Sequence, residues 1–369
     1  MKILHFYKTY LPDSVGGVEQ VISQIALSGT SLGVDTEVLA LSPTTVERTI
    51  KIDNHYVHRC QSNFEIASTH FSVSAFLMFR QLAKEADIIH YHFPYPFADL
   101  LHFITRVNKP TVLTYHSDIV KQKYLLKLYQ PLMNKFLGSI DHIVSTSPNY
   151  LKSSKVLARF RDKVSVIPIG LDKSTYPTPS KDRLEYWRKK FGDKFFLFVG
   201  VMRYYKGLHI LIEAARNSDY SIVAMGAGPI EKELKHQVEN LGINNIYFTG
   251  FVSDEDKVAL FNLSYAILFP SHLRSEAFGI YLLEGAMYGK PLISSEIGTG
   301  TTYINIDGET GMVVPSSDHG ALRDAMDYLW NNPVVAKKMG ENAEERYLDL
   351  FTADNIAKSY VDLYQSLLD

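Results

Sequence analysis

Residues 265–290 read YAILFPSHLRSEAFGIYLLEGAMYGK and encode a strand, a loop and a helix in that order. The apolar run that opens the segment is typical of a buried strand, and a proline ends it. The following loop carries Glu276. A helix is predicted after Gly279, with Glu284 on it, and a Gly-Lys-Pro sequence stops this helix.

The start of this helix favours an anion. Its first turn presents free backbone N–H groups and the positive end of the helix dipole, and Gly279 has no side chain to keep a phosphate away. Glu276 and Glu284 would flank the phosphate, and each carboxylate can accept hydrogen bonds from hydroxyl groups. This predicts a sugar on one side and a ribose on the other. For an isolated pair of glutamates, a helix cap and a solvated helix face are the simpler interpretation.

The spacing E-x7-E resembles the motif of the retaining glycosyltransferases of family 4. Their α/β fold, GT-B, consists of two Rossmann-like domains facing each other across a cleft. In that family the first glutamate contacts the transferred sugar and the second contacts the nucleotide ribose. The resemblance implies a catalytic role for Glu276 and a donor-binding role for Glu284. It also implies donor contacts for Phe278, Gly279 and Ile280.

The composition is that of an ordinary globular protein, with 369 residues, 46% hydrophobic and 21% charged, and a net charge of -2. This length suits two domains. The single cysteine, Cys60, excludes an internal disulfide. Neither a signal peptide nor a run of about 18 apolar residues is present, so we expect a cytoplasmic protein. The charge balance gives no reason to expect a nucleic-acid partner.

The chain begins with an apolar strand at 3–7 and a loop that ends in Gly16 and Gly17. The dinucleotide fingerprint G-x-G-x-x-G is absent here, which argues against an NAD-dependent oxidoreductase. The loop instead resembles the glycine loop of family 4, whose backbone faces the donor diphosphate. The resemblance implies donor contacts for both glycines and acceptor contacts for Glu19. A simple turn is the alternative interpretation of the glycines.

Strand and helix patterns alternate after this loop and predict a parallel sheet covered on both faces. The strand that begins at Pro110 delivers His116 at its carboxyl end, where ligands bind in sheets of this kind. His116 matches the histidine that family 4 places at the catalytic centre, near the transferred sugar. His90 and His92 are interpreted as structural residues.

The segment 119–137 predicts a basic amphipathic helix, which Pro131 is expected to kink or restart. Two interpretations stay open. One is peripheral contact with the inner face of a membrane, and the other is core packing with a solvated lysine face. The second is favoured.

The domain boundary is expected after Asp172. The segment P-x-G-x-D that ends there resembles the last element of the N-terminal domain in family 4, and 173–181 is rich in Pro, Ser and Thr, as linkers are. The resemblance implies an acceptor-binding domain at 1–172 and a nucleotide-sugar-binding domain at 173–352. The final helix, about 353–369, is expected to pack back onto the first domain.

Two cations, Arg203 and Lys206, follow the strand at 195–199 in a short loop. Arginine offers a fork of donors to phosphate oxygens and lysine a point charge, so together they can neutralise a departing diphosphate. The resemblance implies catalytic roles for both. Family 4 commonly has arginine directly after the glycine that ends this strand, but here Val201 holds that position.

The pattern V-x-D-x-x-K at 252–257 resembles the run beside the base in family members that use guanine nucleotides. It implies nucleotide contacts for Val252, Asp254 and Lys257. An aspartate can accept two N–H groups from guanine, a pattern that uracil cannot supply. The acidic run Asp254, Glu255 and Asp256 also suits the first turn of a helix. That interpretation is more plausible than a D-x-D metal motif.

These resemblances together imply a retaining hexosyltransferase that needs neither metal nor cofactor. The expected donor is GDP-mannose, because the loop G-T-G-T-T-Y at 298–303 resembles that of bacterial mannosyltransferases of surface polysaccharide assembly. The expected acceptor is a hydroxyl of a glycan or a lipid-linked saccharide, as in O-antigen and lipopolysaccharide biosynthesis. The alternatives are a UDP-sugar donor, a GT-B epimerase or phosphorylase, and an inactive GT-B scaffold.

Overall fold

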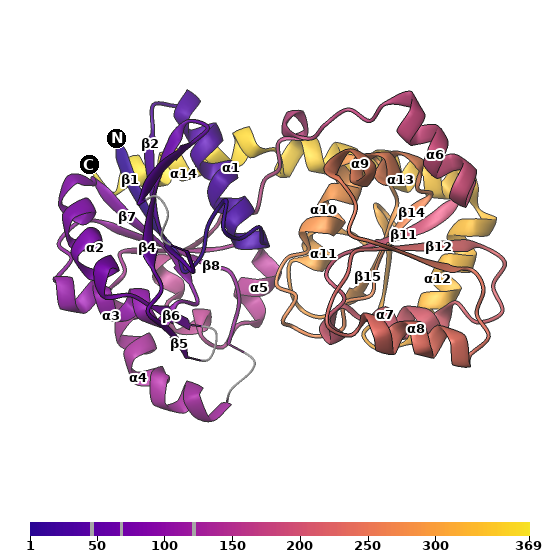
Figure 1. Cartoon of the computed structure of the whole chain (residues 1–369), viewed down its shortest axis with the longest axis horizontal. Coiled ribbons are helices and arrows are strands. Elements are labelled where there is room, and N and C mark those ends of the chain that lie inside the picture. Colours follow the sequence, from indigo (N-terminus) through magenta and orange to yellow (C-terminus); the bar gives the residue numbers. More distant parts are fainter. Residues whose placement is uncertain (45–47, 67–68, 120–122) are drawn as a thin grey trace. The chain divides into compact units, whose positions relative to one another are not determined.

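The computed structural model describes residues 1–44, 48–66, 69–119 and 123–369 (Figure 1). The chain divides into two compact units. Unit 1 comprises Met1–Gly170 and Thr352–Asp369, and unit 2 is the continuous segment Leu171–Phe351. The boundaries expected from the sequence lie slightly further along the chain.

Unit 1 is built on an eight-stranded sheet with the order β10-β9-β8-β7-β1-β2-β4-β3. Its neighbouring strands are parallel, except for the antiparallel pair β3 and β4. The central strands β7 and β8 are buried along their whole length, as strands covered on both faces are. The strands are β1 (Lys2–Phe6), β2 (Asp35–Ser42), β3 (Thr49–Ile52), β4 (His55–Gln61), β7 (Ile88–Phe93), β8 (Thr111–Tyr115), β9 (His142–Ser145) and β10 (Val164–Val166).

Six α-helices and a two-stranded hairpin complete the described part of unit 1. Serine side chains at 72 and 147 cap two of the helices, because each accepts a hydrogen bond from a free N–H of the first turn. The helices are α1 (Gly17–Ser31), α2 (Val73–Glu85), α3 (Pro96–Thr105), α4 (Lys123–Ser139), α5 (Pro148–Ser153) and α14 (Ala353–Ser366), and the hairpin strands are β5 (Phe64–Ile66) and β6 (Thr69–Phe71).

Unit 2 contains a six-stranded, fully parallel sheet with the order β13-β12-β11-β14-β15-β16. Counted within the unit this is the order 3-2-1-4-5-6 of the Rossmann fold, which reverses direction between β11 and β14. The strands are β11 (Phe195–Val199), β12 (Ser221–Met225), β13 (Ile246–Gly250), β14 (Ala266–Phe269), β15 (Leu292–Glu296) and β16 (Gly311–Pro315).

Eight helices accompany this sheet. Phe196, Phe198 and Leu268 from the strands pack with Leu211 and Met326 from the helices in one buried apolar core. The helices are α6 (Lys181–Phe191), α7 (Leu208–Ala214), α8 (Glu231–Asn240), α9 (Asp254–Leu263), α10 (Ile280–Met287), α11 (Thr301–Ile304), α12 (His319–Asn331) and α13 (Pro333–Leu350). Both units are therefore α/β folds on sheets that are parallel apart from the β3–β4 pair of unit 1, and the α/β class predicted from the sequence is confirmed.

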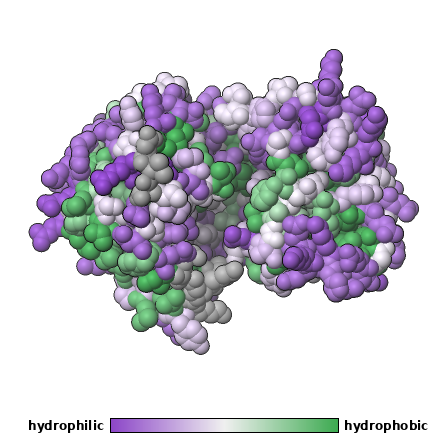
Figure 2. All heavy atoms as spheres, viewed as in Figure 1, coloured by the Kyte–Doolittle hydropathy of each residue, from purple (hydrophilic) through white to green (hydrophobic). Residues whose placement is uncertain are grey.

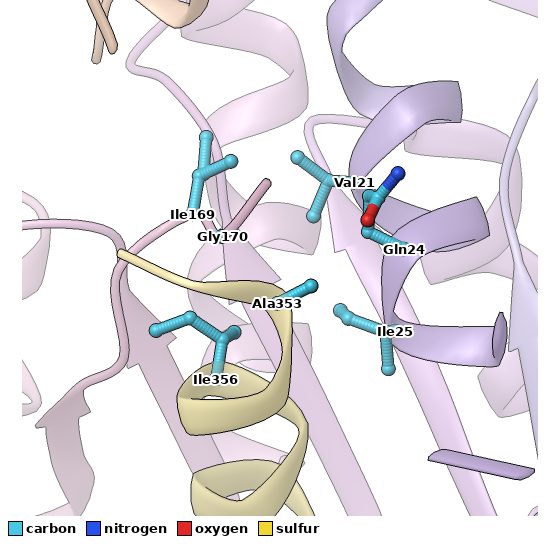
Figure 3. Close-up of a pocket in the computed structure, with 7 residues that line it drawn as sticks. All are labelled: Val21, Gln24, Ile25, Ile169, Gly170, Ala353 and Ile356. Carbon is cyan, nitrogen blue, oxygen red and sulfur yellow. The ribbon is translucent and has the colours of Figure 1, made fainter. Parts of the chain in front are cut away.

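The C-terminal helix α14 belongs to unit 1 and packs against α1. Gly170 is required at this junction, since a Cβ there would lie 2.7 Å from the side chain of Ile356 and 2.9 Å from the carbonyl oxygen of Thr352. A small pocket lies between the two helices, and its lining is drawn in Figure 3: Val21, Gln24, Ile25, Ile169, Gly170, Ala353 and Ile356.

Helix α4 continues through Pro131, so this proline does not restart the helix, and a kink at this position stays a prediction. Two of its apolar side chains stand in solvent, with Tyr124 87% and Leu128 81% exposed. Apolar atoms also show at the surface where Figure 1 labels α3 and α4 (Figure 2). None of the helices in the described ranges is both long enough and apolar enough to cross a membrane.

Candidate active site

Most of the predicted donor site lies where the strand order of unit 2 reverses. Strands β11 and β14 are neighbours, and the chain leaves their carboxyl ends in loops that carry Lys206 and Glu276. Ligands of open parallel sheets bind at such a reversal, outside the carboxyl ends of the strands. The fold therefore brings these two residues together although they are 70 positions apart in the sequence.

Lys206 and Glu276 form a nearly buried ion pair. The Lys206 ammonium donates a hydrogen bond to Oε2 of Glu276, and the hydroxyl of Ser271 lies 3.3 Å from the same oxygen. Burial alone would lower the pKa of Lys206, but the Glu276 carboxylate raises it above the usual lysine value. Rings of Phe269 and Tyr281 surround the ammonium at 5.1 and 5.7 Å from their centroids. The lysine therefore stays cationic in a largely dry environment.

The first turn of α10 is open, as predicted. Gly279 precedes the helix with a φ of +104°, a conformation that favours glycine, and no side chain caps the helix. A Cβ at this position would also lie 3.2 Å from the ring of Phe269. The free N–H groups of the turn, together with the helix dipole, form a site that suits a phosphate. Phe278, just before this turn, is buried, and Ile280, at the start of the helix, is half-buried.

Glu284 is fully buried one turn further along α10. Its Oε1 accepts hydrogen bonds from the Tyr176 hydroxyl at 2.8 Å and from the Lys257 ammonium at 3.1 Å. Within the described ranges its other oxygen, Oε2, has no partner. Burial raises the pKa of this carboxyl group, and the positive charge of Lys257 opposes that effect. The unpartnered oxygen can accept a hydroxyl group of a ligand.

Lys257 connects Glu284 with the predicted base site. Its ammonium lies 3.7 Å from Oδ1 of Asp254, whose side chain is 81% exposed at the first turn of α9. Val252 lies just before this helix and is half-buried. The structure therefore joins Asp254, Lys257 and Glu284 in one chain of contacts, of which the aspartate is the end that faces solvent.

Arg203 takes no part in these contacts. Its side chain is exposed before the short 3-10 turn Tyr204–Lys206, and in the part of the chain that the structure describes it forms no ion pair. Val201 occupies the family's usual arginine position and is 37% exposed. Of the two cations predicted to bind the diphosphate, Lys206 is the one that contacts of the fold hold in place.

His116 lies in unit 1, directly after β8. Its backbone N–H donates to the carbonyl of Phe93 at 3.0 Å, and its Nε2 lies 3.0 Å from Nδ1 of His92. The residue keeps only 8% of its surface exposed, and burial lowers its pKa to about 3. His116 is therefore a neutral imidazole at physiological pH.

The glycine loop after β1 is held in shape by Glu19. The carboxylate accepts hydrogen bonds from the hydroxyls of Thr9 at 2.7 Å and Ser14 at 2.9 Å. It also folds over Gly16, where a Cβ would lie 2.5 Å from Oε2 of Glu19. Gly17 then begins α1. In this arrangement the glutamate stabilises the loop from within.

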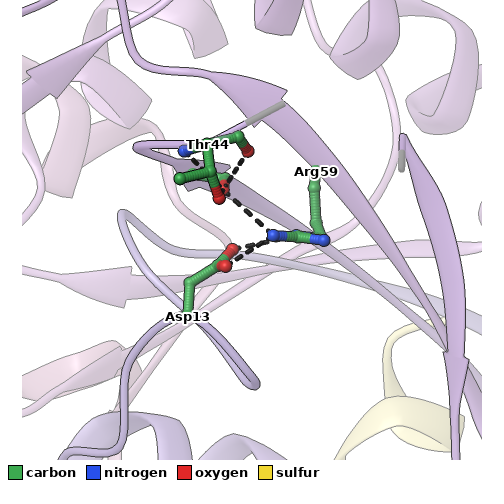
Figure 4. A network of polar contacts seen from close by, with 4 residues as sticks. Asp13, Thr44 and Arg59 are labelled. Carbon is green, nitrogen blue, oxygen red and sulfur yellow. Dashed lines mark hydrogen bonds and ion pairs between the residues drawn. The ribbon is translucent and has the colours of Figure 1, made fainter. Parts of the chain in front are cut away.

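A second set of hydrogen bonds, drawn in Figure 4, connects the same loop with the sheet. Nε of Arg59, on β4, donates to Asp13 at 2.9 Å, and Nη2 donates to the Ser42 hydroxyl at 3.2 Å. That hydroxyl in turn donates to the carbonyl of Thr44 at 2.6 Å. The backbone that leads to Gly16 is therefore fixed at both ends.

Two contacts of the site were not predicted from the sequence. Tyr176, which donates to Glu284, lies in a segment that the sequence presents as a linker. His92, interpreted as structural, is hydrogen-bonded to His116. Its only signal was the H-x-H spacing on a strand, which places both histidines on one face.

Comparison with solved structures identifies the fold as GT-B, with two Rossmann-like domains. Sucrose-phosphate synthase from Thermosynechococcus elongatus matches with a TM-score of 0.81 over 99% of this chain and 98% of that chain, at 20% identity. Anabaena HepE in complex with UDP matches with a TM-score of 0.77 over 99% of this chain and 100% of that chain, at 18% identity. At these identities the likeness concerns the fold.

The chain belongs to glycosyltransferase family 4. The family model Glycosyltransferase Family 4 matches residues 15–175, and Glycosyl transferases group 1 matches residues 183–346. D-rhamnosyltransferase WbpZ of Pseudomonas aeruginosa is 60% identical over 96% of this chain and 93% of the relative. O-antigen chain mannosyltransferase C of Escherichia coli is 50% identical over 100% of this chain and 99% of the relative. The protein is thus a glycosyltransferase, as the sequence predicted.

Proposed function

We propose that this enzyme transfers mannose from GDP-mannose to a hydroxyl of a glycan or lipid-linked saccharide in O-antigen-type polysaccharide synthesis, with retention of configuration. The observation that carries the proposal is the Lys206–Glu276 pair beside the open first turn of α10. It combines a fixed cation, a phosphate-binding helix end and a carboxylate suited to sugar hydroxyls. The E. coli relative, an O-antigen chain mannosyltransferase, supports the choice of sugar and pathway.

A second donor has support from the other relative. D-rhamnose differs from D-mannose only by loss of the hydroxyl at C6, and the P. aeruginosa relative is a D-rhamnosyltransferase. A pocket that holds one sugar can discriminate against the other only through contacts to that hydroxyl. GDP-D-rhamnose is therefore the competing donor, and a UDP-sugar is the alternative with a different base.

In the proposed mechanism the donor diphosphate binds the first turn of α10, at Phe278, Gly279 and Ile280, and displaces part of the Lys206–Glu276 interaction. Lys206 then stabilises the charge that develops on the leaving phosphate, which is electrostatic catalysis. Glu276 orients the sugar through its hydroxyls. The acceptor hydroxyl attacks the anomeric carbon on the face that the phosphate leaves, and the phosphate oxygen takes the acceptor's proton, so the configuration is retained.

The other predicted residues have supporting roles in this proposal. The free Oε2 of Glu284 accepts the ribose hydroxyls, and the exposed Asp254 accepts two N–H groups of guanine, with Lys257 between them. Arg203 is free to turn toward the diphosphate, as an exposed arginine can. His116 lines the reacting face. Gly16 and Gly17 approach the donor, and Glu19 acts on the acceptor through the shape of the loop.

We also propose peripheral contact of α4 with a membrane that carries the acceptor. Tyr124 and Leu128 are highly exposed, and Lys127 lies beside them on the helix. Such a face combines apolar burial with attraction to anionic lipids. Sedimentation with anionic vesicles tests this: Leu128→Glu should abolish binding, and an unchanged bound fraction would contradict it.

The decisive experiment is calorimetric binding of GDP, UDP and ADP with EDTA present, followed by transfer assays with GDP-mannose and GDP-D-rhamnose. Selective GDP binding and a product with the donor's anomeric configuration would support the proposal. Selective UDP binding would overturn the donor, and a requirement for divalent metal would overturn the metal-independent mechanism. Conversion of the donor without any acceptor would indicate an epimerase, and failure to bind any nucleotide would indicate a scaffold.

A further inference from the structure

Four histidines lie side by side in the sheet of unit 1, and only His116 has a role in the proposed function. They come from neighbouring strands: His5 from β1, His90 and His92 from β7, and His116 from the end of β8. The ring of His92 lies between those of His5 and His116, with centroids 5.2 Å apart and planes 20° apart on each side. The histidine at the end of β8 is thus backed by more deeply buried ones.

Hydrogen bonds join three of these rings into a histidine ladder, which we define as His5, His92 and His116. Nδ1 of His92 lies 3.0 Å from Nε2 of His116, and Nε2 of His92 lies 2.9 Å from Nδ1 of His5. Both ring nitrogens of His92 are therefore engaged. The ladder leaves one nitrogen at each end, Nε2 of His5 and Nδ1 of His116.

The rings of the ladder are neutral. His5 and His92 are at most 1% exposed and His116 is 8% exposed. No carboxylate pairs with any of the three in the ranges that the structure describes. Burial lowers the pKa of His5 and of His116 to about 3, and that of His92 well below its usual value. Each ring consequently carries one N–H.

With one N–H per ring, only two proton arrangements satisfy both hydrogen bonds. In the first, His116 donates to His92 and His92 donates to His5, which then carries an N–H on Nε2. In the second, His5 donates to His92 and His92 donates to His116, which then carries its N–H on Nδ1. The tautomer of each ring is fixed by the bond that its neighbour makes, so the three tautomers change together.

The buried end of the ladder selects the second arrangement. Nε2 of His5 is fully enclosed and has no hydrogen-bond partner among the described residues. An N–H at that position would be a buried donor without an acceptor, which native structures avoid more strictly than a buried acceptor without a donor. An unprotonated Nε2 on His5 requires N–H on Nδ1 in all three rings.

We propose that His5 and His92 are positioning residues that fix His116 as its Nδ1–H tautomer, so that the histidine offers its ligand a hydrogen-bond donor and not a base. The ligand would be an oxygen of the sugar or of the acceptor. That identity rests on the proposed function, but the tautomer does not. The ladder therefore assigns His116 to orientation of the substrate, and leaves proton acceptance to the departing phosphate.

His90 supports the ladder without belonging to it. Its ring stacks on that of His92 with centroids 4.6 Å apart, and its two nitrogens bond to the Tyr364 hydroxyl at 2.6 Å and the Thr114 hydroxyl at 2.8 Å. His5, His90 and His92 also have nitrogens within 4.8 Å of one another, a spacing that a metal ion could bridge. Because both nitrogens of His90 and His92 already have partners, we infer hydrogen bonding and not metal binding.

Nuclear magnetic resonance of the donor-free protein tests the tautomer directly. Histidine is labelled with 15N, and the His116 signals are assigned from their loss in His116→Gln. At pH 7.5 we expect a protonated Nδ1 and an unprotonated Nε2. A proton on Nε2, or on both nitrogens, would overturn the proposal, as would a stoichiometric metal ion found by mass spectrometry of the purified protein.

Kinetics test whether His92 acts through His116. Loss of one orienting hydrogen bond should lower kcat about tenfold in His92→Leu, with the donor KM changed by less than about twofold. His92→Asn keeps a donor near Nδ1 and should retain kcat within about threefold. In the His116→Ala background, His92→Leu should have no further effect.

Tyr364→Phe is the matched control, because it disturbs the same buried layer but no bond of the ladder. It should lower the thermal midpoint and leave kcat unchanged. Wild-type kcat in His92→Leu, or a further tenfold loss in the His116→Ala background, would overturn the proposal. If the wild-type protein transfers no sugar at all, the proposed function fails, while the tautomer measured without donor still decides the inference.

Discussion

The two units place opposite kinds of polar chemistry at the carboxyl ends of their sheets. Unit 2 holds charges in pairs, Lys206 with Glu276 and Lys257 with Glu284. Unit 1 holds uncharged rings, in which burial keeps His92 and His116 neutral. Charged groups suit a nucleoside diphosphate, whereas neutral donors suit the hydroxyls of a saccharide. In the proposed function, two sheets of the same α/β class therefore serve two ligands of different charge.

The largest expected difference between the two units is their stability in acid, and unit 1 should unfold at a higher pH than unit 2. Unfolded histidine titrates near pH 6.5, but burial lowers the pKa of His5 and His116 to about 3 and that of His90 and His92 well below 6.5. Below pH 6.5 the unfolded state thus binds more protons, and stability falls as pH falls. Between the unfolded and the folded pKa, each such histidine lowers the free energy of unfolding by about 1.4 kcal/mol for every pH unit of acidification.

Hydrogen exchange followed by mass spectrometry at pH 7.5 and 5.0 measures this unit by unit. Peptides from β1, β7 and β8 should lose protection at pH 5.0, and peptides from β11 and β14 should keep it. Asp256 of unit 2, whose carboxylate accepts hydrogen bonds from Arg183 and Trp187, has a lowered carboxyl pKa and stays ionised at that pH. Loss of protection in both units at the same pH would contradict the prediction.

Removal of the Lys206 charge tests the proposed role of the ion pair. Lys206→Met should lower kcat about 100- to 1000-fold, as loss of transition-state charge stabilisation does. It should also reduce stability by about 3 kcal/mol, because Glu276 is left nearly buried without its partner. Steady-state kinetics and urea unfolding measure the two effects.

A double variant separates fold from chemistry in that experiment. Lys206→Met combined with Glu276→Gln removes both charges and should recover most of the stability but none of the activity. Lys173→Met removes the exposed pair with Glu344 and should cost less than about 1 kcal/mol, without change in kcat. Recovery of activity in the double variant would refute electrostatic catalysis by Lys206.

Glu284→Gln tests the ribose contact and should weaken GDP binding by about 1.5–3 kcal/mol, because a charged acceptor becomes a neutral one. The Tyr176 hydroxyl and Lys257 keep an oxygen to bond, so the fold should persist. Isothermal titration calorimetry measures the affinity. Tyr176→Phe leaves the free oxygen in place and should have a smaller effect, and the reverse ranking would contradict the assignment.

Asp254→Asn should have the smallest effect. The side chain is 81% exposed, so solvent competes with the base, and we expect about 1 kcal/mol of lost GDP affinity with UDP binding unchanged. Competition between the two nucleotides measures the ratio. Equal losses for both nucleotides would remove Asp254 from base recognition.

The strand–loop–helix unit was predictable because its signals are local. An apolar run, Gly279 and a terminating glycine define β14 and α10 almost residue by residue. The pairing of Lys206 with Glu276 was not, since 70 residues separate them and only the strand order brings β11 beside β14. The resemblance supplied both residues, but not their contact.

Partners with no local signal could not be predicted. Tyr176 lies among Pro, Ser and Thr residues, where composition indicates a linker, yet its hydroxyl bonds a buried carboxylate. His92 sits within a strand and not after its end, and that position made a structural role the simpler interpretation. Its bond to His116 depends on strand register. Pro131 is the opposite case, because it has a strong local signal for a helix break, yet α4 runs through it without a restart.

The chain leaves unit 1 after Gly170 and returns to it at Thr352. Residues 171–351 form one uninterrupted insert whose ends meet, since the Leu171 N–H donates to the Phe351 carbonyl at 2.9 Å. The two ends of unit 1 at which this segment is inserted are also adjacent, since Gly170 closely approaches Thr352. In the proposed function this segment binds the nucleotide, and its adjacent ends make it a cassette that recombination can exchange as a single block.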